Sequence, residues 1–451
     1  MKTGILIFTV LLCWPVLLGA EQGTAKESWE SIYLKNDLIE LQAVPVIGGR
    51  ILQYKLGDYA YFHVNSDLYN KPIPASRLGP GGEWLNYGGD KVWPAPQGRG
   101  ENEWPGPPDP VLDGGPYTSE ITMEGNKPTA LRMTSEEDKY SGVQFSRGFQ
   151  IFEGTTHVHV DATMKNINTK PRRWGVWAVT QFNTSNRHGD GFNKNFWTYC
   201  PINPKSMYHQ GYNVMLGLVG HMSYKPDYQN GMMRIQYDHR VGKIGMDSSA
   251  GWLAALDATD GYAFIHRFKY EPDKPYPDNA SVEFWLNGKG ELVAWGSEVI
   301  KMPESVKDTP YLMEAEVLSP FATVAPGESY TFSYDWYAAK VPVGCEIVTC
   351  NEVGITCKKL SAKMREGKLV LDGDFGVFYK GTCRSVFKNT AESPFASKPI
   401  PVTPLKALVL SEISQLADIE APEKATGIAL EIYDADGKLI GVLAEAEIIK
   451  E

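Results

Sequence analysis

Short runs of alternating apolar and polar residues constrain the fold of this chain more than any other feature. Between Tyr330 and Trp336, aromatic side chains alternate with Thr, Ser and Asp, so one face of the segment is apolar and the other is polar. This alternation is typical of a half-buried β-strand. Similar runs, separated by Gly, Pro and Asn-Asp turns, recur from residue 31 to about residue 337 without a sustained helical period. The pattern predicts an all-β fold.

The same pattern predicts two domains. Residues 21–340 are too many for a simple sandwich, so we expect a large domain of two packed β-sheets, with residues 184–230 mainly in loops. Pro342 and Gly344 interrupt the chain and mark a boundary. Residues 341–451 again contain short β-type runs, and they are numerous enough for a smaller β-sandwich with its own core.

The N-terminus resembles a secretory signal peptide over residues 1–20. Lys2 is followed by an apolar run, and Gly19 and Ala20 offer a cleavage site. An uncleaved anchor is the alternative. No later segment is long and apolar enough to span a bilayer. We therefore expect a secreted or periplasmic protein with no stable membrane span after cleavage.

Composition narrows the class of partner. The formal net charge is -10 and no basic cluster interrupts it, which argues against a nucleic acid as partner. Aromatic residues make up 12% of the chain, enough for a large β core or for platforms that stack on sugar rings. The expected partner is a carbohydrate ligand, and no pattern indicates a cofactor.

Four of the five cysteines beyond the signal are clustered near the C-terminus. In an oxidising compartment the cluster predicts two disulfides, with three possible pairings that the spacing does not separate. Cys200 is expected to be a buried free thiol. The clustered residues are Cys345, Cys350, Cys357 and Cys383.

The segment from Asn86 to Gln97 has the strongest local indication of a ligand site. Two glycines allow a sharp turn, and an acid and a base follow at Asp90 and Lys91. Trp93 then offers an indole face on a stretch that prolines stiffen. We predict that Asn86, Asp90, Trp93 and Gln97 contact a sugar. The alternative is a surface turn with a half-buried tryptophan.

Three further residues are candidate ligand contacts. Arg50 follows a Gly-Gly turn, from which its guanidinium could donate to ligand oxygens or face solvent. Trp104 lies in the Gly- and Pro-rich region 66–118, which we expect to form an ordered lid. Trp177 lies in a predicted strand, Trp174 to Asn183.

In each of two pairs of polar residues, the two members are two positions apart in a predicted strand, so both point to the same face of that strand. Glu314 and Glu316 lie in the predicted strand Tyr311 to Leu318, and as neighbouring carboxyls they can raise each other's pKa. His157 and His159 have the same spacing, but no third ligand has a matching spacing, so we expect an exposed polar face and no metal site.

In order and spacing, three motifs resemble the galactose mutarotase-like superfamily, most closely an uncharacterised bacterial branch. They are the turn Gly48-Gly49-Arg50-Ile51, the segment Gly88-Gly89-Asp90-Lys91-Val92-Trp93-Pro94, and the strand carrying Glu314 and Glu316 before the turn Pro326-Gly327-Glu328. The resemblance covers roughly residues 30–340. It implies a β-supersandwich that binds carbohydrate on a concave face.

The resemblance also implies acid–base residues, because enzymes of this superfamily interconvert sugar anomers with a glutamate base and a histidine acid. Glu316 or Glu314 matches the glutamate, and Glu316 lies nearer the end of its strand. Val179 stands where the superfamily has its histidine. The acid is left open among four residues: Lys91, His188, His209 and His266.

Three functions follow. The first is an epimerase-type enzyme acting on a sugar, with Glu316, Glu314 and Lys91 as catalytic residues. The second is a non-catalytic glycan-binding module, which the absent histidine favours. The third is a polysaccharide lyase or hydrolase on the same fold, in which Asp90 would face Glu316 across a cleft.

Overall fold

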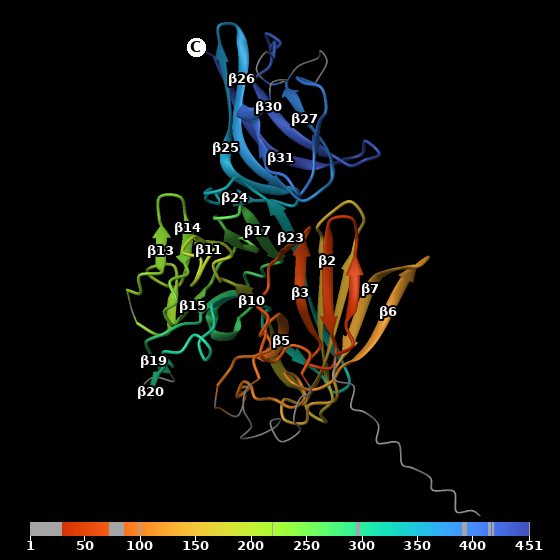
Figure 1. Cartoon of the computed structure of the whole chain (residues 1–451), viewed down its shortest axis with the longest axis vertical. Helices are drawn as coiled ribbons and strands as arrows, with labels where there is room; N and C mark the ends of the chain where they lie inside the picture. Colours follow the sequence, from red (N-terminus) through yellow and green to blue (C-terminus); the bar gives the residue numbers. More distant parts are fainter. Residues whose placement is uncertain are drawn as a thin grey trace, which may run out of the picture.

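The computed structural model describes residues 29–71, 85–98, 100, 102–218, 220–294, 298–389, 395–413, 416 and 419–450. The predicted signal peptide and part of the predicted lid lie outside these ranges. Within them the regular secondary structure is almost entirely strand, with two short 3-10 turns, η2 (Pro277–Asn279) and η3 (Leu410–Glu412). The predicted all-β fold is confirmed (Figure 1). The described ranges contain no helix long and apolar enough to cross a membrane.

The first large sheet has eleven strands. Its hydrogen-bonded order is β1 (Ile32–Lys35), β2 (Ile39–Val44), β3 (Arg50–Leu56), β5 (Asp90–Ala95), β10 (Arg172–Asn183), β21 (Leu312–Leu318), β18 (Val282–Leu286), β15 (Gly242–Met246) and β12 (Asn213–Leu216). Two short strands lie off this path: β4 (Tyr59–Ala60) pairs with β3, and β22 (Ala322–Val324) pairs with β10.

The second large sheet has ten strands. Its order is β13 (Tyr224–Asp227), β14 (Met232–Gln236), β11 (Phe196–Pro201), β16 (Trp252–Asp257), β17 (Tyr262–Phe268), β23 (Ser329–Lys340), β9 (Val158–Asn166), β8 (Val143–Ile151), β7 (Lys127–Thr134) and β6 (Thr118–Glu124). Residues 184–230 contain the short strands β11, β12 and β13 and otherwise lie mainly in loops, as predicted. A separate hairpin pairs β19 (Glu291–Ala294) with β20 (Glu298–Lys301).

The inner faces of the two large sheets form one aromatic core. Tyr54 of the first sheet contacts Phe264 of the second at a ring-centroid distance of 5.1 Å, and Phe182 contacts the same ring at 5.4 Å. Trp336 of β23 is fully buried in the same cluster. The apolar faces that the alternation predicted therefore meet between the sheets.

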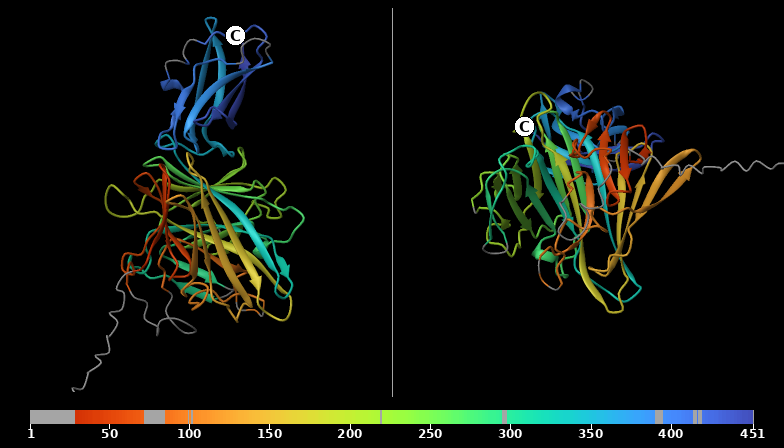
Figure 2. Two further views of the ribbon diagram at one scale, coloured as in Figure 1. Left: turned by 90° about the vertical axis from the view of Figure 1, so that its right-hand side faces the viewer. Right: turned by 60° about the horizontal axis from the view of Figure 1, so that its bottom comes forward.

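Residues beyond Gly344 form a third large sheet of eight strands. Its order is β28 (Ile400–Val402), β27 (Gly381–Lys388), β30 (Gly427–Tyr433), β31 (Leu439–Ile449), β25 (Gly354–Arg365), β26 (Lys368–Val377) and β29 (Leu408–Val409), with β24 (Thr349–Cys350) paired to β25. This sheet has its own apolar cluster and stands at one end of the two large sheets (Figure 2). Tyr337 of β23 stacks on Phe378 at 4.7 Å and joins the two parts.

The clustered cysteines do not form two disulfides, which corrects the prediction. All described cysteines are free thiols, including the buried Cys200. The Sγ atoms of Cys345 and Cys357 lie 2.8 Å apart. Cys350 is buried at the junction with the second sheet, whereas Cys383 is buried in the core of the third sheet. Because these two residues belong to different clusters, only the first pair is placed for a bond.

The central strands β5 and β21 of the first sheet are buried on both faces, as is β16 of the second sheet. Every residue of β5 and β21 is buried, whereas β8 and β9 alternate between buried and partly exposed residues. One face of β5 and β21 packs in the aromatic core. Their other, outer face carries charged side chains, and this face is the candidate site.

Candidate functional site

Charged residues from neighbouring strands lie in register on the outer face of the first sheet. β10 pairs with both β5 and β21, and β18 pairs with β21. This pairing sets four residues in one row across the sheet: Lys91, Val179, Glu316 and Glu283. Val179, at the position of the superfamily's histidine, is therefore a buried neighbour of both Lys91 and Glu316. A parallel row contains Gln181, Glu314, Trp285 and Lys243.

The Lys243 ammonium contacts two carboxyl groups at once. Its Nζ is 2.6 Å from Glu283 Oε2 and 3.0 Å from Glu316 Oε2. The same Nζ lies 4.3 Å from the centroid of the Trp177 ring, and Trp177 Nε1 donates to Glu316 Oε2 at 2.5 Å. One ammonium and one indole thus contact a pair of buried acids.

Burial dominates the titration of this group. Burial raises the pKa of Glu316 to about 8. The positive charge of Lys243 lowers this pKa but has a smaller effect than burial, and the nearby carboxyl groups of Glu283 and Glu314 raise it further. Burial also raises the pKa of Glu283. Burial alone would lower the pKa of Lys243, but the two carboxylates hold it above its usual range. At neutral pH the group therefore keeps a proton on a carboxyl and a positive charge on Lys243.

A second ion pair lies in the neighbouring positions. Lys91 Nζ is 3.3 Å from Glu314 Oε1 and 4.6 Å from the centroid of the Trp93 ring. Gln181 Nε2 donates to the same Glu314 oxygen at 2.6 Å. Burial lowers the pKa of Lys91, and the charge of Glu314 opposes this decrease. The Glu314 side chain is 10% exposed, whereas that of Glu316 is fully buried.

Three side-chain oxygens on this face have no hydrogen-bond partner among the described residues. They are Oε1 of Glu316, Oε1 of Glu283 and Oε1 of Gln181, and all three are buried. Buried polar atoms are nearly always hydrogen-bonded, so unpaired acceptors in one place need an explanation. The Glu283 and Gln181 oxygens could accept a hydrogen bond from a ligand hydroxyl, and the protonated Glu316 carboxyl could donate one.

Arg50 and Trp93 lie at this face, and most of their polar groups already have partners, although the buried Arg50 Nε has none among the described residues. Arg50 is fully buried, donates to the Gly88 carbonyl at 3.0 Å and pairs with Asp113 Oδ1 at 2.6 Å. Trp93 Nε1 donates to the same Asp113 oxygen at 3.2 Å. Trp104 is also fully buried and contacts the Trp93 ring at 5.1 Å. Contrary to the prediction, neither tryptophan offers an open stacking surface.

Asp90 does not lie on the candidate face, which corrects the prediction. Consecutive residues of a strand point to opposite faces, so Asp90 and Lys91 cannot share one. Asp90 is fully buried between the two sheets, where it pairs with Arg147 and accepts from Thr180 Oγ1 at 2.7 Å. Because Glu316 lies on the outer face, the hydrolase pair of Asp90 and Glu316 is excluded by the register.

Asn86 lines a hollow of about 590 Å³ at the edge where β5 and β21 begin. Its lining is rich in amides and charges and consists of Asn65, Asp67, Leu68, Lys71, Leu85, Asn86, Asn287, Lys307, Asp308 and Pro310. Lys91 is the second residue of β5 and Glu314 is the third residue of β21, so both lie close to this edge. Gln97 is exposed at the far end of β5 and is not part of the lining.

The other acid candidates lie elsewhere. His266 is buried in the aromatic core, and burial lowers its pKa to about 3. His188 is paired with Asp260 at 2.6 Å on an exposed loop, and His209 is exposed. Of the four candidates, Lys91 alone lies on the face that carries Glu314 and Glu316.

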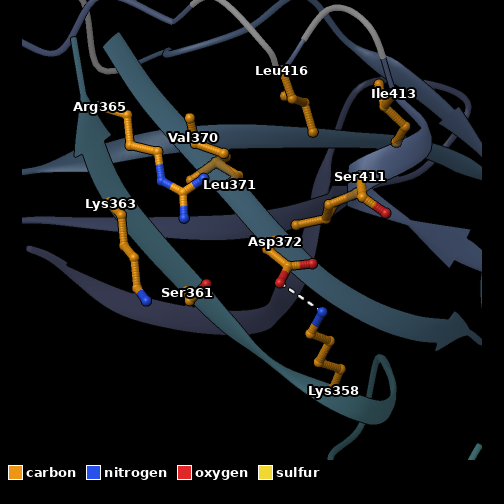
Figure 3. A pocket seen from close by; sticks show the side chains of 11 residues that line it. Lys358, Ser361, Lys363, Arg365, Val370, Leu371, Asp372, Ser411, Ile413 and Leu416 are labelled. Carbon is orange, nitrogen blue, oxygen red and sulfur yellow. Dashed lines mark ion pairs between the residues drawn. The ribbon is translucent and has the colours of Figure 1, made fainter. Parts of the chain in front are cut away.

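A second hollow, of about 480 Å³, lies in the third sheet (Figure 3). Its lining includes Lys363 and Arg365 of β25, and Lys358 Nζ is 2.6 Å from Asp372 Oδ2. None of the residues predicted as site residues from the sequence lines it.

Comparison with a family model assigns the larger part of the chain. Residues 29–339 match the model described as a domain of unknown function, DUF4380. The chain belongs to the DUF4380 family. The matched region spans both large sheets and every residue of the candidate site.

Solved structures similar to this DUF4380 protein include galactose mutarotase-like proteins. One from Lactobacillus casei ATCC 334 is 11% identical, with a TM-score of 0.41, and the match covers 68% of this chain and 100% of that one. One from Clostridium acetobutylicum is 11% identical, with a TM-score of 0.41, and the match covers 69% and 96%.

A TPR-domain containing protein from Parabacteroides distasonis ATCC 8503 is also similar to the DUF4380 chain. It is 13% identical, with a TM-score of 0.45, and the match covers 72% of this chain. The chain spans half the length of that protein.

Sequence reasoning missed several residues of the DUF4380 site. Lys243 and Glu283 come from β15 and β18, and only long-range pairing brings them to Glu316. His63 was also missed: its pKa is lowered to about 4, first by burial and then by the charge of Lys91. His63 Nε2 has no hydrogen-bond partner within the described ranges. The alternating residues around Glu283 are typical of a strand, but they do not indicate which strands pair with it.

Proposed function

We propose that this DUF4380 protein is a secreted or periplasmic protein that binds a carbohydrate on the outer face of its first sheet and transfers protons to and from it. In this proposal Glu316 is the proton donor and Glu314 the proton acceptor. The ammonium group of Lys91 compensates the negative charge of Glu314, and that of Lys243 compensates the charge of Glu316 when it is ionised. The substrate class is a free sugar whose anomeric hydroxyl and ring oxygen face the two carboxyls.

The unpaired oxygens of Glu316, Glu283 and Gln181 carry this proposal. The Glu283 and Gln181 oxygens are hydrogen-bond acceptors, the protonated Glu316 carboxyl is a donor, and a sugar hydroxyl can both donate and accept. The site also provides two ammonium groups, on Lys91 and Lys243, that can donate to ring or hydroxyl oxygens. Isolated buried ion pairs are poor stabilisers of a fold, so a buried charged group of this size favours a functional role.

The assignment of acid and base rests on the different surroundings of two carboxyls on one strand face. Glu316 is fully buried and, with a pKa of about 8, is protonated at neutral pH. Glu314 is the less deeply buried carboxyl, with 10% of its side chain exposed, and is paired with the Lys91 ammonium. Their Cα atoms are about 6.7 Å apart along the strand, since each residue of a strand rises about 3.3–3.4 Å.

Such a pair suits the interconversion of sugar anomers. A base removes the proton of the anomeric hydroxyl while an acid protonates the ring oxygen, which opens the ring. The C1–C2 bond rotates, the ring closes on the other side, and the two protons return. Both groups work best with a pKa near the working pH. The pKa of Glu316 meets this requirement, and neither step needs a cofactor.

Val179 favours a second candidate function, a non-catalytic glycan-binding module. A buried valine separates Lys91 from Glu316 in the row where the superfamily resemblance implies a histidine. In such a module the same acceptors would bind a sugar without turning it over.

Exchange NMR between the α and β anomers of a panel of free aldoses, amino sugars and uronic acids tests the proposal. We expect the wild-type protein to accelerate exchange for one sugar class, and Glu316→Gln and Glu314→Gln to lose about 10²–10⁴-fold of that acceleration. Glu40→Gln is a matched control, because Glu40 lies in β2 of the same sheet and pairs only with surface lysines.

Two other outcomes decide against the enzyme. Saturable sugar binding with no acceleration would establish the non-catalytic module. Neither binding nor acceleration across the panel would refute the carbohydrate proposal.

A further inference from the structure

The outer face of the second sheet carries a group of five polar residues that the proposed sugar chemistry does not use. His157 and His159 lie at the start of β9, with side chains pointing away from the core that Val158 and Val160 enter. β23 pairs with β9 so that Asp335 lies opposite His159, and Ser333 opposite Asp161. Asp335, which lies 176 positions after His159 in the sequence, thus provides the third ligand that the local spacing did not indicate.

The ligand atoms converge on one carboxylate oxygen. His157 Nε2 lies 2.7 Å from Asp335 Oδ1, and His159 Nδ1 lies 2.8 Å from the same oxygen. One ligand atom from each of the three residues lies within 4.8 Å of the others. The three side chains are 21%, 37% and 33% exposed, so a hydrated ion can reach them from solvent.

The surroundings hold both imidazoles in orientation. The ring of His157 is stacked between Phe152 at 4.8 Å and Tyr337 at 4.7 Å. His159 Nε2 lies 3.4 Å from Asp161 Oδ1, and Ser333 Oγ donates to that same Asp161 oxygen at 2.6 Å. A carboxylate at the far nitrogen of a histidine places the proton there and leaves the near nitrogen free to coordinate a metal.

We propose that this group is a metal site for a divalent first-row transition ion, with Zn²⁺ as the ion that fits best. His157 Nε2, His159 Nδ1 and an Asp335 oxygen would be the three protein ligands, and water would take the fourth position. Two imidazoles and one carboxylate are a usual set for an open zinc site, whereas calcium and magnesium prefer oxygen ligands.

Metal binding requires an adjustment of all three ligands. Zinc–nitrogen and zinc–oxygen bonds of about 2.0–2.2 Å place tetrahedral ligand atoms about 3.3–3.5 Å apart. The distances of 2.7 and 2.8 Å in the metal-free structure would therefore lengthen by about half an ångström. A rotation of the partly exposed Asp335 carboxylate can provide this, and the two imidazole nitrogens, which lie within 4.8 Å of each other, would have to approach to the same spacing.

The site also lies beside the junction with the third sheet. Tyr337 stacks on His157 through one face and on Phe378 through the other, and the Thr155 hydroxyl donates to the Phe378 carbonyl at 2.9 Å. A bound ion would fix His157 and with it this stack. Zinc binding should therefore raise the melting temperature of the protein, since an ion that binds only the folded state stabilises it.

Isothermal titration of zinc chloride into the tag-free full chain, stripped of metal with EDTA and exchanged into a non-chelating buffer, tests this inference. We expect one zinc ion per chain and an increase in melting temperature. His159→Gln and Asp335→Asn should weaken binding by more than about 100-fold, the upper end of the loss seen when only a supporting residue is changed. Asp161→Asn should weaken it by about 10–100-fold.

His188→Ala is the matched control, because His188 forms an equivalent imidazole–carboxylate contact with Asp260 at a single exposed site. It should leave zinc affinity unchanged. Circular dichroism of each variant without metal establishes that it is folded. Zinc affinity that is equal in the wild type and in folded Asp335→Asn would overturn the proposal, as would a wild-type protein that binds no zinc.

Discussion

The protonated state of Glu316 predicts an unusual effect of pH on stability. Glu316→Gln keeps the shape of the side chain and makes the neutral form permanent. The amide oxygen can still accept from Trp177 Nε1 and Lys243, which hydrogen-bond Glu316 Oε2 at 2.5 and 3.0 Å. The new amide N–H groups can donate to Glu283. The variant should therefore fold like the wild type in which Glu316 is protonated.

The pKa values give the sign and the size of the effect. In the folded protein Glu316 holds its proton up to a pH of about 8, whereas an ordinary glutamate loses it near 4.5. Between these values the folded state binds more protons than the unfolded chain, so the wild-type free energy of unfolding falls as the pH rises. At 1.36 kcal/mol for each pKa unit, the upper limit of this loss is about 5 kcal/mol.

Urea unfolding at a series of pH values from 5 to 9 measures the effect. Wild type and Glu316→Gln should be similarly stable near pH 5, and the variant should be the more stable protein by several kcal/mol near pH 9. Glu314→Gln, a change of the neighbouring carboxyl on the same strand, should keep most of the wild-type pH dependence. Parallel curves for wild type and Glu316→Gln would refute the assignment of the raised pKa.

Three further predictions concern packing, charge and the thiols. Trp93→Ala should lower the free energy of unfolding by about 3–5 kcal/mol in urea, because the indole is buried; an unchanged midpoint would mean that it is not part of the packing. Lys91→Met should lower the free energy of unfolding by about 3–5 kcal/mol, because it leaves the Glu314 carboxylate without its ion-pair partner. The double variant Lys91→Met with Glu314→Leu should recover most of that loss. A double variant that is no more stable than Lys91→Met would contradict the pairing. Mass mapping after mild air oxidation should find a bond between Cys345 and Cys357 and the other cysteines free, and a different pairing would count against the arrangement of the thiols.

The parts of the site that follow from local periodicity could be predicted from the sequence. Glu314 and Glu316 are spaced by two in a strand, which places both on the outer face. The same rule separates Asp90 from Lys91, so predicting Asp90 as a ligand contact beside Lys91 as a catalytic residue was inconsistent with it. The glycines of β15 weaken the apolar alternation there, which is why the strand that supplies Lys243 was not predicted.

Residues that meet only through long-range strand pairing could not be predicted. Glu283 lies opposite Glu316 because β18 pairs with β21, and Asp335 lies opposite His159 because β23 pairs with β9. Nothing in the spacing along the chain encodes which strands are neighbours. Arg147 illustrates the same limit, since its buried pairing with Asp90 joins two different sheets.

The most direct test of the proposed sugar site follows the indole N–H of Trp177 by ¹H–¹⁵N NMR during titration with the sugar that the exchange panel selects. This N–H donates to Glu316 Oε2, so a ligand that contacts the unpaired oxygen of that carboxyl must perturb its signal. Trp177→Phe assigns the resonance. We predict a saturable shift of the Trp177 signal in the wild type that is absent in Glu316→Gln. Sugar binding that leaves the Trp177 signal unchanged and moves other tryptophans instead would contradict the placement of the site.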